Sequence, residues 1–151
     1  MPRLAGKAGP LDGVWRYTDT AADLRAAGVP EGDIIPGNYG TSTMVIDRGR
    51  FAATTEDQQA CIWSYGTLTV RGDRFEELVT HGGGIPAGVP VNVPGELFTF
   101  GWSLYRGVLT LSPVQGAVSP APPKPWVMIS TTPSAGFLSP RCLPPAGALP
   151  R

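Results

Sequence analysis

One segment of the sequence places acidic residues inside an apolar pattern, Phe75-Glu76-Glu77-Leu78-Val79. Side chains of a β-strand alternate between its two faces, so burial of Phe75 and Val79 would bring Glu77 inward with them. A carboxyl group in an apolar interior has a raised pKa and can act as a general acid or base. The alternative is a bulge at Glu76 and Glu77, which would bury Phe75 and Leu78 and leave both acids in solvent.

The single histidine, His81, lies one strand period beyond Val79 and would share the face of Glu77 if the strand continued. Four residues at about 3.3 Å each would separate Glu77 and His81 by about 13 Å, so they could flank a ligand but could not share a proton. In the alternative, His81 is an exposed residue at the start of a glycine-rich loop. Tyr65 could orient a ligand oxygen from a cavity wall. We therefore take Glu77, His81 and Tyr65 as candidate catalytic residues.

The composition excludes several other kinds of chemistry. Twelve basic and twelve acidic residues give a net charge of zero, and without a basic stripe we expect no nucleic-acid partner. Cys61, Cys142 and a lone His81 do not form a metal motif, and the glycine run 82–84 lacks the lysine and helix of a phosphate loop. We expect neither a metal nor a cofactor.

No apolar run is long enough to span a bilayer, so we expect no membrane partner. The first ten residues lack the apolar core of a secretory signal, which predicts a cytoplasmic protein. In a reducing cytosol Cys61 and Cys142 would be free thiols rather than a disulfide.

High glycine and proline contents, 20 and 17 residues, favour short strands joined by turns. A capping-box-like spacing from Thr20 to Asp23, followed by Gly28, predicts a short helix over residues 21–27. The expected strands are Asp12–Thr18, Thr41–Asp47, Phe51–Thr55, Cys61–Val70, Phe75–Thr80, Leu97–Tyr105, Val108–Ser112 and Trp126–Ser130.

Eight strands joined mostly by short turns, with one short helix between the first and second, predict an all-β fold: a single antiparallel up-and-down barrel. A Greek-key sandwich is the competing fold. The barrel is expected over residues 11–132, after an N-terminal extension of residues 1–10. A proline-rich tail, residues 133–151, would follow it, wrapping the outside or remaining mobile.

The early Gly13-Val14-Trp15, together with a barrel of this size, resembles the lipocalin-like or calycin group. The resemblance implies that Trp15 plugs the closed end of the barrel and that a basic residue, Arg141 or Lys124, packs over it. The bias toward alanine, glycine, proline and arginine is typical of high-GC bacteria. Some small bacterial β-barrels, which this chain resembles in size and architecture, act as cyclases in polyketide pathways.

Alternation also predicts which side chains line the barrel. In the expected strand Leu97–Tyr105, the side chains of Phe98, Phe100 and Trp102 share one face. In the first expected strand, Trp15 and Tyr17 point inward together. The expected ligand-binding residues are Trp15, Tyr17, Phe75, Phe98, Phe100 and Trp102. A barrel of eight strands is just wide enough to hold one small ligand or to be filled by its own side chains, so a packed core is the alternative.

Two functions fit this fold. In the first, a cofactor-free enzyme binds an apolar, polyketide-like substrate and promotes cyclisation or isomerisation, as a monomer or homodimer. In the second, a carrier or sensor binds a similar hydrophobic small molecule without changing it. A purely structural barrel with a filled core is a third possibility.

Overall fold

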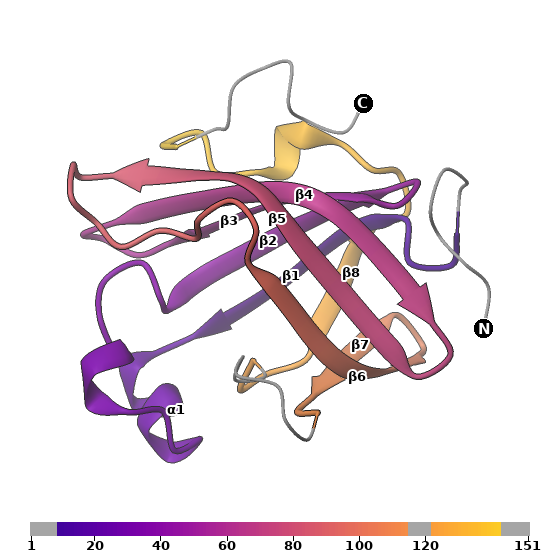
Figure 1. Ribbon diagram of the computed structural model, residues 1–151, viewed down its shortest axis with the longest axis horizontal. Helices are drawn as coiled ribbons and strands as arrows, with labels where there is room; N and C mark the ends of the chain where they lie inside the picture. The colour runs from indigo at the N-terminus through magenta and orange to yellow at the C-terminus, as the bar shows by residue number, and fades with distance from the viewer. Residues whose placement is uncertain (1–8, 115–121, 143–151) are drawn as a thin grey trace.

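The computed structural model describes residues 9–114 and 122–142, and within them eight antiparallel strands close into one barrel (Figure 1). The strands are β1 (Gly13–Asp19), β2 (Gly40–Asp47), β3 (Arg50–Glu56), β4 (Cys61–Arg71), β5 (Arg74–Ile85), β6 (Leu97–Tyr105), β7 (Val108–Ser112) and β8 (Trp126–Ser130). Each strand pairs with the next along the chain, and β8 pairs with β1. This order confirms the up-and-down barrel and excludes the Greek-key sandwich.

The predicted helix is present as α1 (Ala21–Ala26), directly after β1. The Thr20 hydroxyl accepts a hydrogen bond from the Asp23 backbone N–H at 3.1 Å, and the Asp23 carboxylate accepts one from the Thr20 N–H at 2.9 Å. This capping box fixes the start of a helix that is too short to be stable alone. Leu24 is the buried residue of the helix. Two short 3₁₀ turns, η1 (Glu31–Asp33) and η2 (Ala135–Phe137), complete the elements.

One end of the barrel is closed by tight hairpins. Between β2 and β3, Arg48 and Gly49 both have positive φ, 51° and 77°, as a two-residue turn requires. Leu11 is fully buried at this end, and its carbonyl accepts a hydrogen bond of 2.9 Å from the Trp15 indole N–H. Trp15 therefore lies in the closed part of the barrel, as predicted.

The basic residues expected over Trp15 are at the opposite end. Lys124 forms an ion pair of 3.3 Å with Asp23 of α1, and the Arg141 guanidinium donates to the Asp57 carbonyl after β3. The expectation that one of them packs over Trp15 is therefore wrong. These two residues follow proline-rich segments whose course the strand pattern does not determine.

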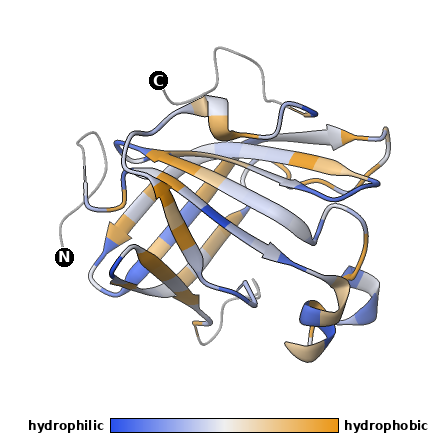
Figure 2. Cartoon of the chain, turned by 180° about the vertical axis from the view of Figure 1, so that it is seen from behind, coloured by the Kyte–Doolittle hydropathy of each residue, from blue (hydrophilic) through white to orange (hydrophobic). Residues whose placement is uncertain are grey.

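Hydrophobic and hydrophilic residues alternate along the strands (Figure 2). The inward side chains pack against one another in one hydrophobic cluster that occupies the closed half of the lumen and reaches Trp126. The buried members of this cluster are Leu11, Trp15, Met44, Ile46, Phe51, Leu68, Val70, Phe75, Val79, Phe100, Leu109, Leu111 and Trp126. The filled-core alternative is thus correct for this half of the barrel.

Residues 133–142 cross the outer face of the barrel (Figure 1). Leu138 is buried against Val14, Val45 and Ala52, the outward side chains of three neighbouring strands. Cys142 then forms a disulfide with Cys61 at the start of β4. The prediction of free thiols is wrong, because docking of this segment brings together two cysteines that are 81 residues apart.

Candidate functional site

A β-bulge decides which side chains of β5 enter the lumen. Along β4 and β5, Leu68 pairs with Glu77 and Gly66 pairs with Val79, but Tyr65 pairs with His81. Thr80 is therefore the extra residue, and alternation is interrupted after Val79 rather than at Glu76 and Glu77. Gly66 makes the bulge possible, because a side chain there would collide with the Leu78 backbone carbonyl oxygen.

Glu77 consequently faces the lumen. Its cross-strand neighbours are Leu68 on β4, which is fully buried, and Phe98 on β6, which is partly buried. The side chain is half-buried, and loss of contact with water raises the pKa of its carboxyl group to about 7. A carboxyl group with this pKa can both accept and donate a proton near neutral pH.

Tyr17 lies close enough to Glu77 for the two to interact electrostatically. Burial raises the pKa of the Tyr17 hydroxyl to about 12, although a hydrogen bond with Ser42 opposes the increase. The Tyr17 ring meets Trp126 edge to face, with 4.5 Å between centroids. Tyr17 is therefore a neutral hydrogen-bonding group, held in place by β2 and β8.

Above Tyr17 the barrel opens into a cavity of about 420 Å³, hereafter the mouth cavity. Its floor is formed by strand residues and its rim by α1, by the connection between α1 and β2 and by the segments before β6 and β8. The lining residues are Tyr17, Asp19, Leu24, Val29, Asp33, Asn38, Asn92, Glu96, Phe98, Pro122 and Pro123. Apolar walls with a few polar groups are typical of small-molecule sites.

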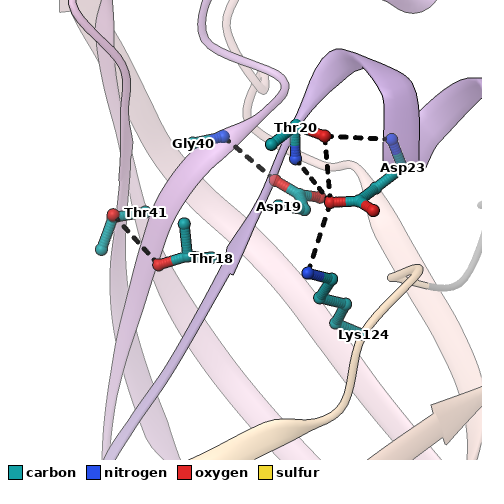
Figure 3. Close-up of polar contacts among 7 residues, drawn as sticks. All are labelled: Thr18, Asp19, Thr20, Asp23, Gly40, Thr41 and Lys124. Atoms are coloured by element: carbon teal, nitrogen blue, oxygen red, sulfur yellow. Dashed lines mark hydrogen bonds and ion pairs between the residues drawn. The ribbon is translucent and has the colours of Figure 1, made fainter.

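Two buried polar atoms at this end of the barrel have no hydrogen-bond partner among the described residues: Asp19 Oδ2 and Trp126 Nε1. The other oxygen of Asp19, Oδ1, accepts from the Gly40 N–H at 3.0 Å. Figure 3 shows that the nearby Lys124 ammonium is directed to Asp23. Burial raises the pKa of the Asp19 carboxyl group. Unsatisfied buried groups are uncommon in folded proteins and often mark a site that a ligand or water completes.

The residues predicted to bind a ligand divide between the two halves of the lumen. Tyr17 and Phe98 line the mouth cavity. Trp15, Phe75 and Phe100 belong to the filled half. Trp102 packs against that filled half, and its indole N–H donates to the Gly72 carbonyl at 2.9 Å, in a turn at the closed end.

The three candidate catalytic residues do not come together. Tyr65 and His81 stack on the outer face of the barrel with 4.6 Å between ring centroids, while Glu77 faces the lumen. Asp19 was missed by the sequence analysis, although it lies two residues after Tyr17 and hence on the same face of β1. Extending that alternation by one period would have identified it.

No family model matches the chain, and no curated protein or solved structure is significantly similar to it. Within residues 9–114 and 122–142, no group of three or more His, Cys, Asp or Glu side chains could hold a metal ion. Among the same residues, no helix combines the length and the apolar character needed to cross a membrane.

Proposed function

We propose that this protein binds a small, largely apolar molecule in the mouth cavity. The observation that carries the proposal is the division of the lumen: side chains fill the closed half, while the open half keeps about 420 Å³ above Tyr17 and Phe98. A purely structural barrel has no need of this cavity. Nor does it need a carboxyl group, Glu77, facing an apolar lumen.

Binding without chemistry is the form of the proposal that we favour. The Gly13-Val14-Trp15 motif at the closed end and the closed barrel resemble lipocalin-like carriers. The Cys61–Cys142 disulfide supports the same assignment, because disulfides persist mainly in oxidising compartments, where a carrier or sensor would work. A cytoplasmic location, predicted from the N-terminal sequence, does not fit with this bridge.

Glu77 favours a second candidate, a cofactor-free enzyme that promotes cyclisation or isomerisation of a polyketide-like substrate. A carboxyl group with a pKa of about 7 can transfer a proton between two positions of a bound molecule. The neighbouring Tyr17 hydroxyl, which keeps its proton, could donate a hydrogen bond to a substrate oxygen. In this candidate Glu77→Gln would lose turnover but not affinity.

The binding proposal is tested by closing the mouth cavity from its rim. Val29 lines the cavity, so Val29→Trp would fill part of it. Val127→Trp is the matched control, because Val127 is 48% exposed on the outer face of β8. Binding of tryptophol, a neutral aromatic alcohol, is measured by calorimetry, and its position is mapped by NMR.

We expect Val29→Trp to weaken binding by about tenfold or more and Val127→Trp to leave it within about twofold. Chemical shift changes should centre on Tyr17 and Phe98 and leave Trp102 unaffected. Equal affinity in both variants, or shift changes confined to the outer face, would refute the mouth cavity as the binding site.

A further inference from the structure

The mouth cavity is acidic as well as apolar. Three carboxylates line it, Asp19, Asp33 and Glu96, and its described lining contains no lysine, arginine or histidine. Lys124 interacts electrostatically with Asp19, but the three carboxylates outnumber this one cation, so the described site disfavours an anionic ligand.

Asp19 is the acidic residue with the clearest need for a partner. It is only 4% exposed, and its Oδ2 accepts no hydrogen bond from any described residue. Lys124 interacts electrostatically with Asp19, but its ammonium pairs with Asp23 at 3.3 Å, and Asp23 also accepts from Thr20 (Figure 3). A buried carboxylate oxygen without a hydrogen bond is costly, and a ligand that donates to it offsets that cost.

Aromatic rings lie directly below Asp19. Tyr17 is two residues earlier on the same face of β1, at about 7 Å along the strand, and Trp126 packs against its ring. Phe98 lines the same cavity. Aromatic faces attract cations as well as hydrocarbon, so this wall suits a ligand whose apolar body ends in a positive charge.

We propose that the ligand of the mouth cavity is an apolar amine, whose ammonium group donates to Asp19 and whose hydrocarbon part lies against Tyr17 and Phe98. This inference rests on the proposed function and specifies its ligand class. A primary or secondary amine satisfies Asp19 Oδ2 with an N–H donor, and the ammonium charge balances the acidic rim. A bare metal ion fits less well, because the described carboxylates are not grouped to coordinate one.

The test compares three indole compounds that differ only in the end group: tryptamine, tryptophol and indolepropionate. Calorimetry at neutral pH measures the affinity of each for the unaltered protein. We expect tryptamine to bind about tenfold more tightly than tryptophol and indolepropionate to bind most weakly.

Asp19→Asn keeps an oxygen that can accept from the Gly40 N–H and removes the charge. It should reduce the preference for tryptamine over tryptophol to about twofold or less. Asp73→Asn is the control, since Asp73 is an exposed carboxylate in the turn at the closed end, and it should keep the full preference.

The outcomes separate this inference from the proposal on which it rests. If tryptophol binds as tightly as tryptamine at the mouth cavity, the cavity binds apolar molecules and the amine inference is wrong. If none of the three binds, the proposed function fails as well. Because the comparison of ligands uses the unaltered protein, it decides the question even if Asp19→Asn does not fold.

Discussion

Glu77 and His81 lie on opposite faces of β5, although they are four residues apart and uninterrupted alternation would place them on the same face. The extra residue, Thr80, reverses the alternation of side chains between the two faces of the strand. Its hydroxyl donates to the Tyr65 carbonyl at 3.1 Å, which holds the bulge in place. The bulge therefore keeps the lumen carboxyl group apart from the only imidazole.

Gly66→Ala should destabilise the barrel by about 2–4 kcal/mol, because the new methyl group would collide with the Leu78 carbonyl oxygen in the bulge. Urea unfolding measures the loss. Gly32→Ala is the control, since no atom lies within 4 Å of a side chain added there. Its effect should be within about 0.5 kcal/mol. Equal stabilities for the two variants would show that β4 and β5 do not pair through this bulge.

The free energy of unfolding should depend on pH through Glu77. Burial raises its pKa from 4.5 to about 7. Between these values the folded protein keeps a proton that the unfolded chain releases, so stability falls as the pH rises through this window. Each pKa unit corresponds to about 1.4 kcal/mol, so the total loss is up to about 3 kcal/mol.

Glu77→Gln removes this contribution, and Glu76→Gln is its matched control on the outward face of the same strand. Urea unfolding at pH 5 and pH 8 should show a smaller decrease in stability for Glu77→Gln than for the unaltered protein. Glu76→Gln should show the same decrease as the unaltered protein. An unchanged pH dependence in Glu77→Gln would mean that this carboxyl group is solvated.

The Cys61–Cys142 disulfide should make a large contribution to stability. A bridge across 81 residues restricts the unfolded chain, and loops of this length correspond to about 4 kcal/mol. Reduction, or replacement of both cysteines by serine, should lower the free energy of unfolding by about this amount. Titration of the denatured, unreduced protein should find no free thiol. Two free thiols would show that the tail does not dock with Cys142 beside Cys61.

Alternation along the strands was sufficient to predict the barrel and its inward faces. It placed Tyr17 and Phe98 in the lumen because each belongs to a strand with a regular apolar pattern. For Glu77 it left two alternatives, an inward side chain or a bulge at Glu76 and Glu77, and the structure has the bulge later in the strand, at Thr80. Alternation failed at His81, because a one-residue bulge reverses every later side chain and depends on the contact between Gly66 and the backbone of β5.

The mouth cavity could not be predicted in the same way. Its rim is formed by irregular segments, among them Leu24, Val29 and Asn92, whose positions follow from tertiary packing and not from a repeating pattern. The disulfide was missed for a related reason. Cys142 reaches Cys61 only because Leu138 is buried on the outer face of the barrel, a contact without a periodic signal.

Ligand binding should be insensitive to the outer aromatic stack. Trp63, Tyr65 and His81 stack on the outer face of β4 and β5, with centroid distances of 5.7 Å and 4.6 Å between successive rings. His81→Ala should therefore leave the affinity of the mouth cavity within about twofold, whereas Phe98→Ala should weaken it by about tenfold through lost apolar contact. Calorimetry with tryptophol compares the two variants.

The His81 ring gives an independent measure of where the ligand binds. Its ring signals can be followed by NMR at a fixed pH with and without tryptophol. A ligand in the mouth cavity is separated from His81 by the wall of the barrel, so these signals should not move. A chemical shift change of the His81 ring on ligand addition, together with loss of affinity in His81→Ala, would place the ligand on the outer stack and remove the lumen from the binding site.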